Sequence, residues 1–137
     1  MFCILVSILF GLFIPFFNLI PLSYSFLIGI PLLIFGIYIV LHTYSIFKNN
    51  NTPESFKESV CVVDEGIYRY SRNPMYLGFL IALIGVSFIS RNILSFISPI
   101  FFFLVVQFMF IPFEEEKMKK EVGKKYLEYK EKVRKWI

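Results

Sequence analysis

The chain has 137 residues, of which 57% are hydrophobic and 20% are aromatic, and its formal net charge is +4 at pH 7. A soluble core of this size needs far less apolar surface, so the composition excludes an ordinary soluble domain and predicts an integral membrane protein. The length allows a single domain over residues 1–137, so any functional site has to overlap with the membrane part.

Uncharged apolar runs account for most of the chain, and a bilayer span takes about 20 helical residues. We expect transmembrane helices over residues 2–20, 22–47, 74–90 and 93–113, of which the third is the shortest. The first run lacks the basic start and the small-residue cleavage site of a signal peptide, so we expect it to be retained. The predicted fold is an all-α integral membrane protein with about four transmembrane helices.

Small residues recur at helical spacing in the two middle runs. Gly78, Ala82 and Gly85 lie on the third run, and Gly29 and Gly36 lie on the second. Small residues on one face let the backbones of neighbouring membrane helices approach closely. We therefore expect the two helices to pack through these positions.

Charged residues are confined largely to a loop over 48–73 and a tail over 114–137. Of the 14 Lys and Arg residues, only Arg91 lies between the third and fourth runs. Because positive charge is retained on the cytosolic side, this distribution predicts that both termini are cytosolic. The loop and the tail then lie on the same side and can form a shared site.

The tail predicts a cytosolic amphipathic helix over about 114–135, and a basic helix of this kind is attracted to anionic membrane lipid. Its apolar stripe consists of Met118, Val122, Tyr126, Tyr129, Val133 and Trp136. Interleaved glutamates and the membrane location argue against nucleic acid as a partner. Gly123 would cost about 1 kcal/mol in the middle of a helix, so we expect a ligand or another helix to approach the backbone there.

Residues suited to metal binding or acid–base chemistry are few. Cys3 and Cys61 lack the spacing of a metal site, and they suggest neither a disulfide framework nor a bound metal. His42 is the only histidine and lies near the cytosolic end of the second run. We interpret it as an interfacial residue rather than as a catalytic base.

The densest group of functional residue types lies in 66–78, which reads Gly-Ile-Tyr-Arg-Tyr-Ser-Arg-Asn-Pro-Met-Tyr-Leu-Gly. Asn73 and Pro74 are a favourable N-cap and first-turn pair, and a helix start offers free backbone donors to an anion. Arg69 and Arg72 add fork-shaped donors suited to a carboxylate or a phosphate. The alternative is an ordinary interfacial belt of arginine and tyrosine, and composition does not separate the two.

Acidic residues follow the fourth run. Helical spacing places Glu114 and Glu115 beside the buried stripe of the tail, whereas Glu116 should turn toward water. Carboxylates near low-dielectric surroundings need a cation as a partner. The alternatives are a salt bridge to Arg69 or Arg72, an ordinary solvated run of charges, or a site for a positively charged ligand.

The order of these residues resembles the isoprenylcysteine carboxyl methyltransferase and phospholipid methyltransferase superfamily. The motifs are Gly-x-Tyr-Arg-Tyr-x-Arg-Asn-Pro-Met-Tyr-x-Gly at 66–78, then Pro112-x-Glu114-Glu115-x-x-Met118 and Gly123-x-x-Tyr126-x-x-Tyr129. The resemblance covers roughly the C-terminal half of the chain. It implies an S-adenosyl-L-methionine-dependent methyltransferase that holds its cofactor between the loop and the tail and methylates a lipidic or prenylated acceptor.

The resemblance also implies roles for individual residues. Arg69, Arg72 and Glu115 would be catalytic, with the arginines facing an anion of the cofactor or the substrate. The cofactor pocket would be lined by Tyr68, Asn73, Pro74, Tyr76, Leu77, Gly78, Glu114 and Glu115.

One position departs from the family pattern. Many family members carry histidine where Asn73 stands, and asparagine cannot titrate, so proton transfer at this position is excluded. Methylation of a carboxylate depends mainly on positioning and desolvation and needs no general base. We therefore expect carboxylate O-methylation rather than amine N-methylation.

Two other classes of protein remain open at this stage. Membrane sterol reductases share a related C-terminal signature, so an NADPH-dependent reductase is one alternative, although the chain is short for enclosing both that cofactor and a sterol. A non-catalytic membrane module that keeps the scaffold is the other. Binding of S-adenosyl-L-methionine, of NADPH or of neither separates the three hypotheses.

Overall fold

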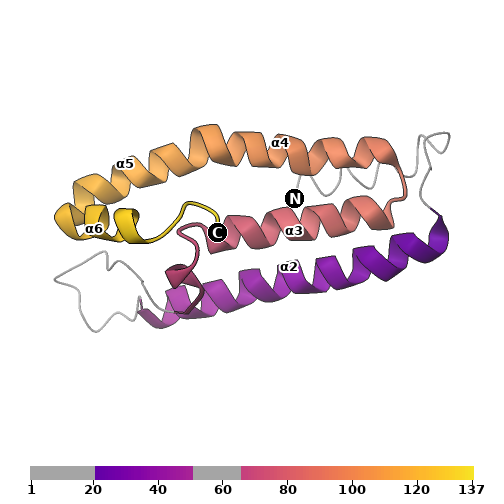
Figure 1. Cartoon of the computed structure of the whole chain (residues 1–137), viewed down its shortest axis with the longest axis horizontal. Helices are drawn as coiled ribbons and strands as arrows, with labels where there is room; N and C mark the ends of the chain where they lie inside the picture. Colours follow the sequence, from indigo (N-terminus) through magenta and orange to yellow (C-terminus); the bar gives the residue numbers. More distant parts are fainter. Residues whose placement is uncertain (1–20, 51–65) are drawn as a thin grey trace.

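The computed structural model describes residues 21–50 and 66–137, and every regular element among them is a helix (Figure 1). The all-α prediction is confirmed for these residues, whereas the expected helix over 2–20 lies outside them. The elements are α2 (Leu22–Asn50), η2 (Gly66–Arg69), α3 (Pro74–Ile89), η3 (Ile93–Phe96), α4 (Ile97–Val105), the π-helix η4 (Val106–Phe110), α5 (Ile111–Val122) and α6 (Lys124–Lys132).

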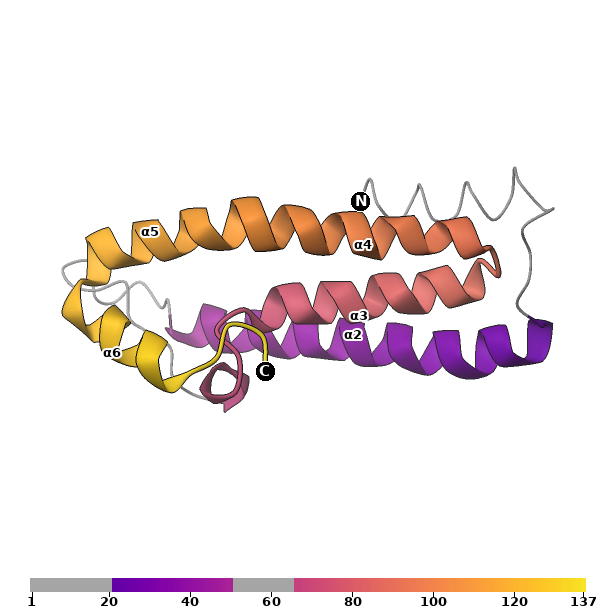
Figure 2. The same ribbon diagram turned by 45° about the horizontal axis from the view of Figure 1, so that its top comes forward.

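Helices α2 and α3 lie side by side and antiparallel (Figure 2). A Cβ atom added to Gly36 would lie 2.5 Å from the backbone nitrogen of Ala82 and 2.6 Å from the carbonyl oxygen of Gly78. A Cβ atom on Gly85 would lie 2.8 Å from the carbonyl oxygen of Gly29. The predicted packing through small residues is therefore confirmed, with backbone against backbone at both ends of the contact.

Helices α4, η4 and α5 follow one another without interruption, so the chain stays helical well past residue 113 (Figure 1). Pro112 lies in the first turn of α5 and has no N–H to donate to the preceding turn. The wider π-helical turn immediately before it takes up this disturbance, and the helix continues. The end of the apolar sequence is thus not the end of the helix.

Aromatic contacts hold α4 and its preceding turn against α3. The rings of Phe88 and Phe96 meet edge to face with centroids 5.1 Å apart, and those of Phe79 and Phe102 do so at 6.4 Å. Edge-to-face pairs add stabilisation beyond the area they bury. They make α3 the central helix of the described bundle, with α2 on one side and α4 on the other.

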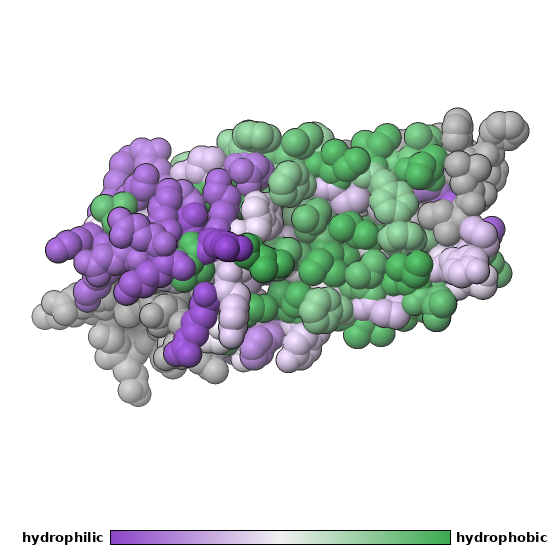
Figure 3. All heavy atoms as spheres, viewed as in Figure 1, coloured by the Kyte–Doolittle hydropathy of each residue, from purple (hydrophilic) through white to green (hydrophobic). Residues whose placement is uncertain are grey.

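The outside of the bundle is apolar over most of its length. Two helical stretches, Leu22–Ile46 and Ile93–Val122, are long and apolar enough to cross a membrane, and Pro74–Ile89 is apolar but shorter. Figure 3 shows the apolar residues over the bundle and the charged residues gathered at the end formed by α5 and α6. This surface indicates membrane association. The number of spans and the side on which the termini lie stay predictions.

The tail is not the single helix expected over 114–135. Helix α5 ends at Val122, Gly123 has φ +65° and ψ −127°, and α6 then runs in a new direction. Apart from chain neighbours, no described atom lies within 4 Å of a Cβ atom built on Gly123. The expectation that another helix approaches this glycine is therefore wrong for the described residues, and its left-handed φ accounts for glycine at this position.

After α6, residues 133–137 return to the start of α3 (Figure 2). The backbone N–H of Arg72 donates to the carbonyl oxygen of Arg134 at 3.0 Å. The change of direction at Gly123 thus places residues 133–137 against the motif at 66–78.

Candidate functional site

A three-residue ion cluster lies where α5 and α6 meet the start of α3. Arg72 Nη1 donates to Glu115 Oε1 at 2.8 Å, and Lys130 Nζ donates to Glu115 Oε2 at 2.5 Å. The Arg72 and Glu115 side chains are only 9% and 14% exposed. Because each oxygen of the Glu115 carboxylate accepts from a different cation, its largely buried negative charge is compensated by two positive charges.

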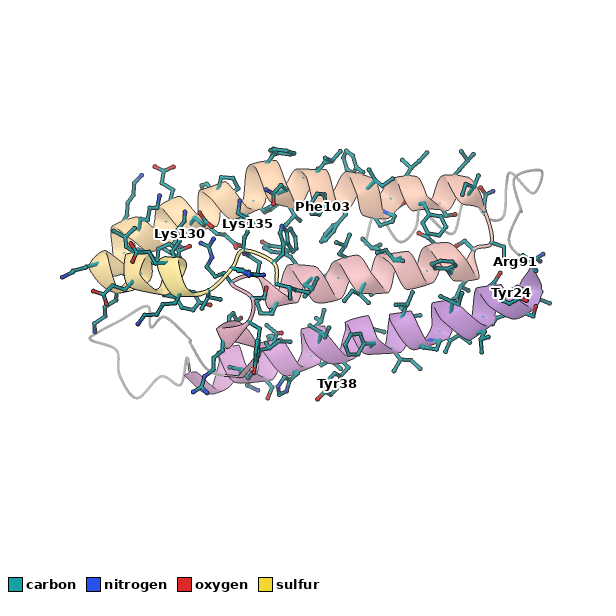
Figure 4. All side chains as sticks on the ribbon, in the orientation of Figure 1. Tyr24, Tyr38, Arg91, Phe103, Lys130 and Lys135 are labelled. Carbon is teal, nitrogen blue, oxygen red and sulfur yellow. The ribbon has the colours of Figure 1, made fainter. Side chains whose placement is uncertain are left out.

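Each member of this ion cluster is positioned by a different element. Arg72 lies in the short link between η2 and α3, Glu115 lies in α5, and Lys130 lies near the end of α6. Lys130 reaches back to Glu115 because the chain reverses at Gly123. Figure 4 labels Lys130 and Lys135 at this same end of the molecule.

Glu115 pairs with one cation that the sequence indicated and with one that it did not. The salt bridge from Glu115 to Arg72 is confirmed as the arrangement of this carboxylate in the structure. Lys130 was not singled out among the lysines of the tail, but its side chain is only 33% exposed and pairs with Glu115. Its position four residues after Tyr126, on the buried face of the tail, is the sequence signal that could have indicated an inward direction.

Tyrosine hydroxyls tie the two motifs together around the cluster. Tyr76 donates its hydroxyl hydrogen to Glu114 Oε1 at 2.7 Å, and Tyr129 donates to the carbonyl oxygen of Tyr68 at 2.8 Å. The first contact joins α3 to α5, and the second joins η2 to α6. The four residues come from both motifs of the resemblance, so the fold brings those motifs into direct contact.

Burial and charge act on two of the tyrosines. Burial, with the nearby negative charge of Glu114, raises the pKa of Tyr68 above its ordinary value. Burial and the charge of Glu115 likewise raise the pKa of Tyr126, and the guanidinium of Arg72 opposes this only in part. Both phenols therefore stay protonated over the physiological range.

Asn73 does not cap α3 in the predicted way. It occupies the N-cap position, but its side chain makes no capping hydrogen bond. Instead, Asn73 Nδ2 donates to the carbonyl oxygen of Lys135 at 2.9 Å, and its backbone N–H donates to Ser71 Oγ at 3.2 Å. The Asn73 side chain thus donates to a carbonyl oxygen distant in the sequence instead of accepting from an N–H of the first turn of α3, which no sequence pattern could reveal.

The remaining predicted site residues differ in their burial and contacts. Gly78 packs against Val40 and the Gly36 carbonyl of α2, and Leu77 is half-buried. Pro74 is fully buried at the start of α3, and Arg69 is exposed at the end of η2. The structure therefore brings together Tyr68, Arg72, Asn73, Tyr76, Glu114 and Glu115, with Lys130 and Tyr126 added.

Arg72 retains one unused donor. Its Nε atom is buried and has no hydrogen-bond partner among the described residues. A buried donor of this kind is costly unless an acceptor reaches it, so a carboxylate or another oxygen ligand fits here. Within residues 21–50 and 66–137, no group of three or more His, Cys, Asp or Glu side chains could hold a metal ion.

The family model for phospholipid methyltransferases matches residues 24–125, which include the start of α3, the long helix and the first residues of α6. The chain belongs to the phospholipid methyltransferase family. The sequence resemblance, carried by the two motifs that meet in the structure, is thereby confirmed at the level of the superfamily.

Curated relatives of this family member include two proteins of Arabidopsis thaliana. They are protein-S-isoprenylcysteine O-methyltransferase B, 38% identical over 53% of this chain and 36% of its own length, and protein-S-isoprenylcysteine O-methyltransferase A, 36% identical over 58% and 40%. The protein-S-isoprenylcysteine O-methyltransferase of Saccharomyces cerevisiae is 32% identical over 77% of this chain and 46% of its own. The chain thus spans less than half the length of these relatives. No solved structure matches the chain.

Proposed function

We propose that the protein is a membrane methyltransferase that uses S-adenosyl-L-methionine to methylate the carboxylate of a lipidic or prenylated acceptor. The observation that carries this proposal is the contact between Arg72 and Glu115, which joins the two family motifs at the polar end of an apolar bundle. The names of the isoprenylcysteine O-methyltransferase relatives support the carboxylate as acceptor. An apolar exterior beside the site supports an acceptor that arrives through the bilayer.

The residues at the ion cluster fit the charges of this cofactor. A bound S-adenosyl-L-methionine would supply an electrophilic methyl carbon on a sulfonium, together with an amino acid group that carries both charges. Glu114 and Glu115 suit its ammonium or ribose hydroxyl groups, and the buried Nε of Arg72 suits a carboxylate. The ring of Tyr76, which lies 6.4 Å from that of Phe110, offers an aromatic surface for an adenine.

The chemistry asks these residues to bind and orient, not to move a proton. The bound cofactor would supply a methyl group whose bond to sulfur breaks as its bond to the acceptor carboxylate oxygen forms. The sulfonium would leave as a neutral thioether and the carboxylate would become a neutral ester, so no base is required. Arg72 and Arg69 would face an anion of the cofactor or of the acceptor, and the apolar helices would keep water away from the acceptor carboxylate. Positioning and desolvation can supply much of the rate of such a displacement.

We further propose that the described helices, with the run over 2–20, form a four-span bundle whose charged end faces the cytosol. The concentration of Lys and Arg in the loop and the tail supports this orientation. The ion cluster would then lie at the level of the lipid headgroups, where a water-soluble cofactor and a lipidic acceptor can meet.

The test is calorimetry on detergent-purified full chain, with S-adenosyl-L-methionine and NADPH as separate titrants. Binding of the first that weakens in Arg72→Ala and Glu115→Ala, but not in the neighbouring exposed Glu116→Ala, would support the proposal. Labelled methyl transfer to an S-prenylated cysteine with a free carboxyl group, compared with phosphatidylethanolamine, then distinguishes the acceptor. Binding of NADPH alone, or of neither titrant, would contradict the proposal.

A further inference from the structure

Gln107 is a polar residue in the middle of an apolar helix. It lies in the π-helical turn η4, between α4 and α5, and the next two residues, Phe108 and Met109, are 70% and 66% exposed. An amide group among apolar side chains is costly unless it is hydrogen-bonded. Its Oε1 atom accepts a hydrogen bond from Trp136 Nε1 at 2.9 Å.

Trp136 is held by a second contact on the same helix. Its ring lies against that of Phe103, with centroids 5.4 Å apart and planes tilted by 33°. Phe103 and Gln107 are four residues apart, so they present one face of the long helix to the indole. Figure 4 shows Phe103 on this helix, at the level where residues 133–137 return toward α3. The indole therefore meets both an aromatic surface and an acceptor.

The residues just before Trp136 hold the first motif. The carbonyl oxygen of Arg134 accepts from the backbone N–H of Arg72 at 3.0 Å, and that of Lys135 accepts from Asn73 Nδ2 at 2.9 Å. Both carbonyls belong to irregular chain, because helix α6 ends at Lys132. A segment outside a helix or a sheet has no regular backbone hydrogen bonds of its own to fix its position. The segment is flanked by the buried Val133 at the end of α6 and by the contacts of Trp136.

We infer that Gln107 and Trp136 form a tether that positions Arg72 and Asn73 by fixing the carbonyl groups of residues 134 and 135. Gln107 and Trp136 are positioning residues, since neither contacts the ion cluster directly. The relevance of this to methyl transfer rests on the proposed function, in which Arg72 and Asn73 belong to the binding site. The tether itself is a property of the fold and can be tested without any ligand.

The rate of hydrogen exchange at the backbone amide of Arg72 reports whether its hydrogen bond to the Arg134 carbonyl is held in place. Gln107→Met keeps the length of the side chain but removes the acceptor, and Trp136→Phe keeps a ring against Phe103 but removes the donor. Each variant should speed hydrogen exchange at the Arg72 amide about fivefold or more. One hydrogen bond is lost, and the remaining polar group is left without its partner. The double variant should be no faster than either single one, because both changes remove the same bond.

The matched control is Phe108→Leu, next to Gln107 on the exposed side of the same turn, which should leave exchange at Arg72 unchanged. Amides of α2 and of the middle of α3 should exchange at the wild-type rate in every variant. Unchanged exchange at Arg72 in Gln107→Met would overturn the inference. Faster exchange throughout the bundle would also overturn it, because the pair would then support the fold in general.

The effect of the tether on cofactor binding is measured separately. If the wild-type chain binds S-adenosyl-L-methionine, Gln107→Met and Trp136→Phe should both weaken that binding, and Phe108→Leu should not. Faster exchange at Arg72 with unchanged affinity would overturn the positioning role at the cofactor site. If the wild type binds no S-adenosyl-L-methionine, the proposed function fails, and the exchange experiment still decides whether the tether exists.

Discussion

The ion cluster leads to a prediction about Glu115. In Glu115→Gln, the side chain keeps its size but loses its charge, and an amide N–H₂ replaces one of the two accepting oxygens. Of Arg72 and Lys130, one still donates to the remaining amide oxygen, and the other faces an N–H₂ group that cannot accept its hydrogen bond. Arg72 is the more sensitive of the two, because its side chain is 9% exposed and cannot recover the lost partner from water.

The size of the effect follows from burial. Removing one member of a buried ion pair typically costs about 3–5 kcal/mol, because the remaining charge is stranded. Here Lys130 is 33% exposed and can regain hydration, and the glutamine carbonyl can still accept one hydrogen bond. We therefore expect Glu115→Gln to lower the free energy of unfolding by about 2–3 kcal/mol.

The assay is chemical unfolding in detergent micelles, followed by far-ultraviolet circular dichroism, with Glu116→Gln as the control. Glu116 is one residue away, pairs with Lys120 at 2.9 Å and has a 66% exposed side chain, so its unfolding midpoint should match that of the wild type. Lys130→Met should cost less in the Glu115→Gln background than in the wild type, because its partner is already lost. Equal midpoints for the two glutamine variants would refute the reasoning from burial.

Three further predictions concern the packing of α2 against α3, the turn at Gly123 and the hydrogen bond from Asn73 to the Lys135 carbonyl. Gly36→Ala forces a methyl group into the backbone of α3 and should lower the free energy of unfolding by about 1–3 kcal/mol, whereas Ser45→Ala on the exposed side of α2 should not, in the same unfolding assay. Gly123→Ala places a side chain at φ +65° in open space, so only backbone strain acts, and a loss of about 1–3 kcal/mol is expected by chemical unfolding. Asn73→Asp replaces the donor to the Lys135 carbonyl by an acceptor, and faster hydrogen exchange in residues 133–137 should follow; an unchanged rate there would contradict the contact.

Local patterns in the sequence were enough to predict the helices of the bundle. Uncharged runs indicated α2 and α3 to within a few residues of their ends, because hydrophobic length and helix formation are linked in a membrane protein. Gly36 and Gly78 indicated which faces would meet, since close approach of two backbones requires small residues at helical spacing. The order of the two motifs indicated that the loop and the tail would share a site.

The partners within that site were decided by tertiary structure alone. Arg72 and Glu115 are 43 residues apart, and the sequence offered both Arg69 and Arg72 as equivalent candidates. Lys130 became a partner only because the chain reverses at Gly123, and a single glycine does not disclose the direction that the chain takes after it. Helical periodicity specifies faces within one element, whereas hydrogen bonds between elements depend on turn geometry and on the relative placement of helices. For this reason the apolar bundle could be read from the sequence, and the contacts that assemble its polar end could not.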